Sequence, residues 1–178
     1  MGSIAGHQAS DPAEASGLLV EPTFVADVNV GRLAKWLRIM GYDTLMPDDT
    51  DDGELIRVAL REGRVILTRD VGIVKRRVVR LGQLKAILIA DDHLAGQIKQ
   101  LGHDLRLEGP RRFSRCIRCN ELLQRISREE AAPQVPEFVL GTQQEFMACP
   151  SCCRVYWKGT HWANMTRELA KLEEEERG

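Results

Sequence analysis

Short apolar runs alternate with amphipathic stretches from Phe24 to Leu107. The apolar runs predict short strands at residues 24–26, 42–46, 64–68, 84–90 and 105–107. Apolar residues at helical spacing predict helices over 30–40, 52–62, 71–81 and 93–101, each followed directly by a glycine. Because strands that alternate with helices form βαβ units, we expect an α/β fold, with a parallel sheet flanked by helices on both faces.

From about Gly109 this pattern changes, because prolines interrupt the chain and all five cysteines lie in this last part. We expect residues 135–147 to supply hairpin strands, and residues 164–177 to form a helix whose Glu173–Glu176 run faces solvent. The expected divisions are a disordered leader, an α/β unit, a small cysteine-rich unit and a charged helix or tail, at residues 1–22, 23–108, 109–165 and 166–178.

Composition narrows the class of protein. The chain has 178 residues, with 25 Lys and Arg against 26 Asp and Glu, and 43% of its residues are hydrophobic. This balance excludes a mostly disordered chain and a strongly basic coat protein. No segment approaches the roughly 20 apolar residues of a transmembrane helix. The stretch from Met1 to Glu21 has no Lys or Arg, which a secretory signal requires. We therefore expect a cytoplasmic protein with no membrane contact.

Acids stand where the expected strands end or the next helix begins. They are Asp27, Asp51, Asp52, Asp70, Asp91 and Asp92. Parallel strands end at the same edge of a sheet, so these side chains are expected near one another. Several carboxylates at one edge repel each other unless a hard cation such as Mg²⁺ lies between them.

Each acid also has a structural interpretation. Capping of a helix N-terminus is the stronger interpretation, taken alone, of Asp51, Asp52, Asp91 and Asp92. Asp27 and Asp70 differ, because they end buried strands, where an unpaired charge is costly. A divalent metal at this edge can activate water and stabilise the transition state of phosphoryl transfer. The residues thus point to metal-dependent phosphodiester hydrolysis.

The cysteines form two Cys-x-x-Cys pairs, Cys116 with Cys119 and Cys149 with Cys152. Zn²⁺ binds four thiolates tetrahedrally, and such a closed site is structural. The interval between the pairs is longer than is usual for zinc sites. The alternative is a redox protein with a reversible Cys116–Cys119 disulfide, but two matched pairs favour zinc. Cys153 is either a spare thiol or exchanges with Cys152 as ligand, and the spacing favours Cys152.

The chain resembles the Mut7-C RNase family in four stretches that occur in this order: DVNVGRLAKWLRIMGYDT, DDGELIRVALREGRVILTRD, CIRCNELL and CPSCCRVYWKGTHW. The resemblance runs from about Phe24 to Met165. It implies a PIN-like nuclease domain followed by a small zinc ribbon, to which the residue pattern adds the C-terminal helix. It further implies that acids of the sheet bind Mg²⁺ or Mn²⁺ and that the domain cleaves RNA.

The resemblance also assigns roles by position. Asp27 matches the acid of the first strand, Asp52 the acid that opens the Asp-x-Glu-Leu-Ile helix, and Asp70 the acid of the Thr-Arg-Asp segment. A fourth acid stays open among Asp51, Glu54, Asp91 and Asp92. The sequence departs from the family in two places. Cys153 stands where the family usually has a small flexible residue, and Ile117 where it often has proline.

Basic residues flank the expected acidic edge, and residues 106–118 add five arginines and one glutamate. The residues expected to contact RNA phosphates are Arg32, Lys35, Arg69, Lys75 and Arg76. Arg38, Arg77 and Arg80 share their helical segments. The alternative is that these cations are solvated helix faces. Packing is the favoured interpretation of Trp36, Tyr156, Trp157, His161 and Trp162.

We therefore expect a Mg²⁺- or Mn²⁺-dependent ribonuclease whose structural zinc ribbon aids RNA binding. The alternative is a non-catalytic RNA- or protein-binding module that keeps the PIN-like fold. An enzyme requires Asp27, Asp52 and Asp70 within reach of a metal, whereas a binding module tolerates their dispersal.

Overall fold

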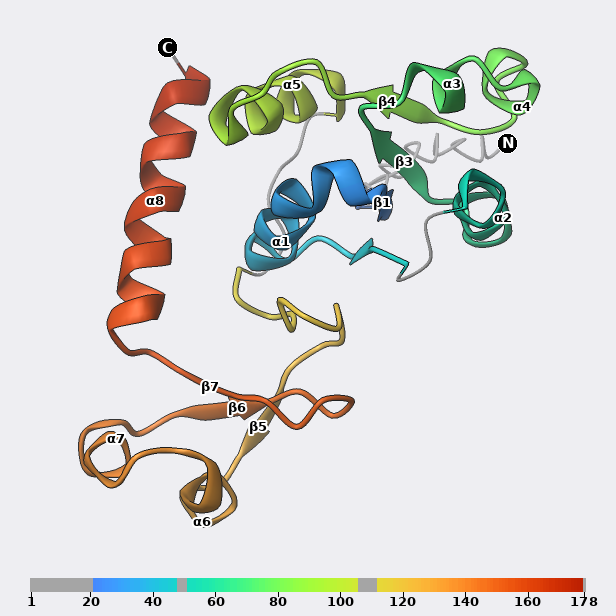
Figure 1. Cartoon of the computed structure of the whole chain (residues 1–178). Helices are drawn as coiled ribbons and strands as arrows, with labels where there is room; N and C mark the ends of the chain where they lie inside the picture. The colour runs from blue at the N-terminus through green and yellow to red at the C-terminus, as the bar shows by residue number, and fades with distance from the viewer. Residues whose placement is uncertain (1–20, 48–50, 106–111, 178) are drawn as a thin grey trace, which may run out of the picture.

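The computed structural model describes residues 21–47, 51–105 and 112–177. Its larger sheet has four parallel strands in the order β2-β1-β3-β4 (Figure 1). They are β1 (Phe24–Ala26), β2 (Thr44–Leu45), β3 (Val65–Thr68) and β4 (Ala86–Leu88). The α/β class and the parallel sheet are thus confirmed, with strands shorter than the apolar runs suggest.

Helices cover both faces of the parallel sheet. Side chains alternate along β1, so Phe24 and Ala26 face one core and Val25 faces the other. The first core is closed by α1 (Gly31–Met40), α5 (Leu94–Leu105) and α8 (Thr160–Arg177). The second is closed by α2 (Asp52–Glu62), α3 (Val71–Val74) and α4 (Arg77–Arg80). The expected helix over 52–62 is therefore confirmed at both ends.

The single helix expected over 71–81 is wrong, because the chain forms two short helices there. Arg76 has an extended ψ of 141° and separates α3 from α4. Ile73 is buried in the second core, and Val78 and Val79 pack against the same core. At 100° per residue, one continuous helix would turn these valines well away from Ile73. The break lets all three reach the core.

The C-terminal end predicted for the helix over residues 93–101 is also wrong. Gly102 lies inside α5, which continues to Leu105. A glycine inside a helix costs about 1 kcal/mol relative to alanine. Leu101 and Leu105 stand four residues apart and both pack on the first core, which offsets that cost. The expected edge strand at 105–107 fails at Leu105, which is helical; residues 106 and 107 lie outside the described part.

The second sheet is antiparallel, in the order β5-β6-β7, with bounds Gln124–Ile126, Phe146–Ala148 and Val155–Trp157. Only β6 comes from the segment expected to form hairpin strands. The chain between β5 and β6 forms α6 (Arg128–Ala131), the 3-10 turn Ala132–Gln134 and α7 (Glu137–Thr142). A capping box between Ser127 and Glu130 starts α6, a Ser-x-x-Glu signal that hydrophobic patterning overlooks.

The last helix begins earlier than expected and returns to the parallel sheet. It starts at Thr160 and packs on α5, so Leu169 and Leu172 are buried in the first core (Figure 1). Glu174 of the acidic run is exposed, and the side chains of its three neighbours lie outside the described part. No helix among the described residues is long and apolar enough to cross a membrane.

Two of the expected divisions fall where the structure gives no description. Residues 1–20 of the expected leader lie outside the described part, and so does the boundary at residues 108–109.

Candidate functional site

The carboxyl edge of the parallel sheet brings Asp27 and Asp70 to neighbouring strands. Asp27 follows β1 and Asp70 follows β3, and these strands are paired directly. The Asp27 N–H donates to the Leu67 carbonyl over 2.9 Å, so the β1–β3 pairing extends to the acid itself. The topology therefore places both acids at the edge where α/β proteins bind ligands.

Thr68, the last residue of β3, links the two acids. Its hydroxyl donates to Asp27 Oδ2 over 2.7 Å and accepts from the Asp70 N–H over 2.9 Å. Thr68 is buried, whereas Asp27 is half-buried and Asp70 is exposed. Asn29 adds a second link, because its amide donates to Asp27 Oδ2 over 2.7 Å and its carbonyl oxygen accepts from the Arg69 N–H over 3.1 Å. These bonds fix the Asp27 carboxylate at the strand end.

Both carboxylates keep an oxygen for a ligand. Asp27 Oδ2 carries the two bonds just described, and Asp70 Oδ1 accepts from the Gly72 N–H over 2.6 Å as α3 begins. Their second oxygens accept no hydrogen bond from any described residue. Two half-open carboxylates on adjacent strands are a donor set that Mg²⁺ and Mn²⁺ accept, with water completing the coordination.

The other expected acids are engaged with cations or with the backbone. Asp52 Oδ2 lies 3.3 Å from Arg76 Nη2, and Asp92 is paired with Arg69. Asp91 Oδ1 accepts from the His93 N–H over 2.7 Å. In the described ranges, no three Asp, Glu or His ligand atoms lie within 4.8 Å of one another. The structure therefore links Asp27 with Asp70 and leaves Asp52 in an ion pair.

Two candidate acids lie at the start of α2. Asp51 occupies the N-cap position, but its side chain makes no capping hydrogen bond, and it lies 3.9 Å from Arg57. Glu54 is paired with the same arginine. Neither is joined to the Asp27–Asp70 network by a hydrogen bond among the described residues.

The basic residues divide into paired and unpaired groups. Arg69 and Arg76 hold the carboxylates named above. Arg32, Lys35 and Lys75 are exposed and form no ion pair with any described residue. Arg38 is the exception to the expected basic face, because it is 3% exposed and binds backbone carbonyls.

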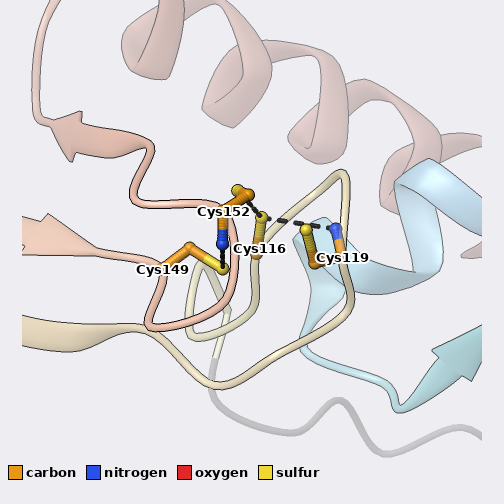
Figure 2. A group of neighbouring side chains, drawn as sticks. All are labelled: Cys116, Cys119, Cys149 and Cys152. Carbon is orange, nitrogen blue, oxygen red and sulfur yellow. Dashed lines mark hydrogen bonds between the residues drawn. The ribbon is translucent and has the colours of Figure 1, made fainter.

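The four paired cysteines gather into one cluster (Figure 2). The sulfurs of Cys116, Cys119, Cys149 and Cys152 all lie within 4.8 Å of one another, and the Cys116 and Cys152 sulfurs are 3.7 Å apart. A tetrahedron with Zn–S bonds of about 2.3 Å has S···S edges of about 3.8 Å. The donor set and its spacing therefore fit zinc.

The two cysteine pairs form matching turns, which we name the first knuckle (residues 116–120) and the second knuckle (residues 149–153). In each, the N–H of the second cysteine points at the sulfur of the first, over 3.4 Å and 3.5 Å. In each, the next residue is left-handed, with φ of 69° at Asn120 and 58° at Cys153. Cys153 is exposed and outside the cluster, so Cys152 is the cysteine that faces the other sulfurs.

Tyr156 completes the surroundings of the cluster, with its hydroxyl 3.1 Å from the Cys116 sulfur. Burial opposes ionisation of this thiol, but hydrogen bonds from Tyr156 and from the N–H groups of Cys119 and Arg118 lower the pKa of Cys116 to about 7. The thiolate form that binds metal is thus more accessible at this position than at an ordinary cysteine. The predicted packing role of Tyr156 is thus a contact with one of the four clustered cysteines.

Comparison with known proteins identifies the family. A family model described as the Mut7-C RNAse domain matches residues 22–169, which is most of the chain. The chain belongs to this family. Searches of curated proteins and of solved structures returned no match. The Mut7-C RNAse domain is of nuclease type, and the four-cysteine cluster is part of the matched region.

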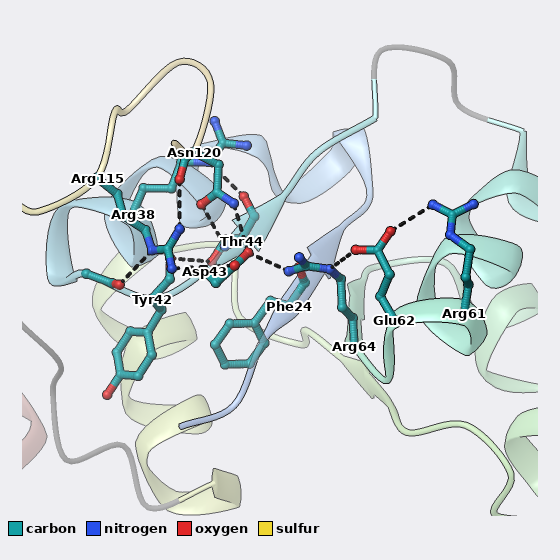
Figure 3. Close-up of polar contacts among 11 residues, drawn as sticks. Phe24, Arg38, Tyr42, Asp43, Thr44, Arg61, Glu62, Arg64, Arg115 and Asn120 are labelled. Carbon is teal, nitrogen blue, oxygen red and sulfur yellow. Dashed lines mark hydrogen bonds and ion pairs between the residues drawn. The ribbon is translucent and has the colours of Figure 1, made fainter. Parts of the chain in front are cut away.

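The Mut7-C domain joins its two sheets through a polar network at the amino edge of the parallel sheet (Figure 3). Asp43, just before β2, is its centre. Asp43 Oδ1 accepts from Arg64 over 2.5 Å and from Asn120 Nδ2 over 2.8 Å, and Asp43 Oδ2 lies 3.4 Å from Arg115. We call these four residues the Asp43 cluster. It ties the strand β2 to the first knuckle.

Arg38 and Asn120 add backbone contacts to this junction. Arg38 donates to the Ile117 and Arg118 carbonyls over 3.0 Å and 2.9 Å. Asn120 Oδ1 accepts from the Thr44 N–H over 2.9 Å. The knuckle backbone is therefore held by α1 and β2. The sequence carries no signal for this junction, because the residues that it joins are more than 70 positions apart along the chain.

Replacing Asp43 by asparagine is expected to lower the free energy of unfolding by about 2 kcal/mol at pH 7, because two arginines lose a charged acceptor. Burial alone would raise the pKa of Asp43, but hydrogen bonds from Arg64 and Asn120 and the charges of Arg64 and Arg115 hold it below the usual range. A lowered folded-state pKa stabilises the protein above the unfolded pKa of about 3.9 and ceases to do so as pH falls through the folded value.

Urea unfolding of wild type and Asp43→Asn between pH 7 and pH 3 measures this difference. It should be constant from pH 7 to pH 5 and shrink below about pH 4. A difference that grows on acidification would contradict the role given to Asp43.

Aromatic residues of the final matched stretch are packed. Trp162 lies against Phe113 with ring centroids 5.2 Å apart, and Trp157 packs on the core of the antiparallel sheet. Trp36 packs against the first core, as expected. The packing expected of His161 is wrong, because this side chain is exposed in the first turn of α8.

Proposed function

We propose that this Mut7-C domain hydrolyses RNA phosphodiester bonds with Mg²⁺ or Mn²⁺ held at the carboxyl edge of the parallel sheet. The observation that carries the proposal is the Asp27–Thr68–Asp70 arrangement. Two acids on adjacent strands share one buried threonine, and each keeps a carboxylate oxygen open. Asp27 and Asp70 are the proposed principal ligands.

Asp52 is the proposed third ligand. It opens α2 at the same edge of the sheet and is half-exposed, with only one oxygen in the ion pair with Arg76. A divalent metal bound there supplies Lewis-acid stabilisation of the phosphoryl transition state and lowers the pKa of water. Thr68 and Asn29 act as positioning residues, because both donate to the Asp27 carboxylate and so orient it.

Cations near this edge would hold the RNA backbone. Arg32, Lys35 and Lys75 are unpaired among the described residues and exposed, so they suit phosphate contacts directly. Arg69 and Arg76 are paired with Asp92 and Asp52, so RNA phosphates would compete with those carboxylates for them.

The cysteine cluster is the proposed structural zinc site, with Cys116, Cys119, Cys149 and Cys152 as ligands. Four unpaired thiols gathered in one place suit a reducing compartment, and we propose a cytoplasmic location. Zinc there would stiffen the first knuckle, which presents its carbonyls to Arg38. The ribbon thereby braces the sheet and offers a further surface for RNA.

Cleavage of a mixed panel of single-stranded and structured RNAs tests the proposal. Zinc-loaded wild type should cleave only when Mg²⁺ or Mn²⁺ is added, and the variant Asp70→Asn should lose at least about tenfold in rate. Equal cleavage by both proteins, or cleavage that needs no added metal, would contradict an active site at Asp70.

The second candidate is a binding module that retains the fold without catalysis. One observation favours it: Asp52 is ion-paired, and the described acids form no three-ligand group within 4.8 Å. This candidate predicts retention of RNA by wild type without cleavage under any metal condition, and unchanged retention by Asp70→Asn.

A further inference from the structure

The acidic edge and the cysteine cluster lie at opposite ends of one helix. Asp27 stands just before α1, on the carboxyl edge of the sheet. At the other end of α1, Arg38 binds carbonyls of the first knuckle, and the Ile39 carbonyl accepts from the Phe113 N–H over 2.8 Å. Figure 1 shows the yellow segment that carries the knuckle starting beside this end of α1. The helix therefore connects the proposed catalytic edge with the zinc ribbon.

Exposed cations that form no ion pair with any described residue lie on α1 and on the first knuckle. Arg32 and Lys35 stand three positions apart in α1, so they share one face of the helix. Arg118 is exposed on the first knuckle, and its own carbonyl is held by Arg38 at the end of α1. The side chains of these three residues form no hydrogen bond or ion pair with any described residue. We call Arg32, Lys35 and Arg118 the α1 track.

We propose that an RNA strand cut at the acidic edge runs along the α1 track to the first knuckle. The inference rests on the proposed function, and it adds where the strand goes and what the ribbon contacts. Unpaired, exposed guanidinium and ammonium groups bind phosphates without first breaking another ion pair. A single row of cations suits one strand, whereas a duplex presents two backbones.

The length of α1 sets the spacing of the two contacts. Its ten residues span about 15 Å. Neighbouring phosphates of one strand are at least about 3.4 Å apart, so about four nucleotides or fewer span the length of α1 itself. The ribbon would therefore grip the strand a fixed short distance from the scissile phosphate.

Salt-dependent RNA binding tests the track without relying on cleavage. Fluorescence anisotropy of a labelled twelve-nucleotide single-stranded RNA is measured between 50 and 200 mM salt, with no Mg²⁺ or Mn²⁺ added. Each lost phosphate contact lowers the slope of log affinity against log salt by about 0.7 for a single strand. Arg118→Ala should lower the slope by about 0.7, and the triple variant Arg32→Ala, Lys35→Ala, Arg118→Ala by about 2.

Arg128→Ala is the matched control. Arg128 is an exposed arginine of the same ribbon, on α6, with no ion pair to any described residue, and its removal should leave the slope unchanged. A wild-type slope in the triple variant, an equal loss in Arg128→Ala, or no RNA binding by wild type would each overturn the track. Slopes that change as expected, in a protein that cleaves no RNA, would keep the track and refute the nuclease proposal instead.

Discussion

Substituting asparagine for Asp27 is expected to lower the rate of RNA cleavage by at least about 100-fold. Each tenfold in rate corresponds to about 1.4 kcal/mol, and a bound divalent metal contributes several kcal/mol to stabilising a phosphoryl transition state, which is lost when the ligand that holds it is lost. Asparagine has the shape of aspartate and keeps an oxygen that accepts from Thr68 and Asn29, so the local hydrogen bonds persist. What it removes is the negative charge at the strand end.

The measurement is initial cleavage rate under saturating Mn²⁺ or Mg²⁺, with zinc content and thermal unfolding recorded for each protein. Asp104→Asn provides the matched control, because Asp104 is an exposed acid on α5, outside the acidic edge. Its rate should equal that of wild type. A wild-type rate in Asp27→Asn would place the reaction elsewhere and refute the assignment of Asp27.

The meeting of Asp27 and Asp70 at one edge of the sheet could be predicted from their positions after buried strands and from the parallel arrangement of those strands. Asp27 and Asp70 each follow a buried strand, and parallel strands end at the same edge whatever the loops do. Thr68 and Asn29 could not be predicted, since a threonine at the end of a strand and an asparagine between a strand and a helix are ordinary residues. Their role comes from side-chain distances across two strands.

In the fold, too, local patterns could be predicted from the sequence and tertiary contacts could not. The helix over 52–62 could be placed to the residue, because an apolar stripe and a closing glycine agree. The segment 71–81 has a glycine and β-branched residues, and only packing against the second core decides that it breaks at Arg76. The first knuckle could be recognised as a metal motif from spacing, but its attachment to Asp43 depends on tertiary contacts alone.

Replacing Cys149 by serine is expected to abolish zinc binding and to unfold the antiparallel sheet. Structural zinc contributes about 10–16 kcal/mol of apparent binding free energy in small zinc domains at pH 7, which is comparable with the whole stability of a domain. The core of this sheet is small, with few buried residues besides the clustered cysteines. Cys153→Ser is the matched control, because Cys153 adjoins the second knuckle but lies outside the cluster.

Zinc content by elemental analysis and hydrogen exchange of the backbone test this prediction together. Cys149→Ser should contain almost no zinc and lose exchange protection in β5, β6 and β7, whereas Cys153→Ser should match wild type. Full zinc in Cys149→Ser would refute the ligand set, and zinc loss in Cys153→Ser would assign the fourth ligand to Cys153 instead of Cys152.

The loss of exchange protection in Cys149→Ser should also extend into the parallel sheet. Arg38 and Thr44 bond directly to atoms of the first knuckle, and Arg38 is buried. Once the knuckle is disordered, these groups lose their partners, and each buried polar group left without one costs about 1–3 kcal/mol. Exchange protection at Thr44 and at the end of α1 should therefore fall with zinc loss, while α2, on the opposite face, stays protected. Unchanged protection at Thr44 would show that the junction does not transmit the state of the zinc site.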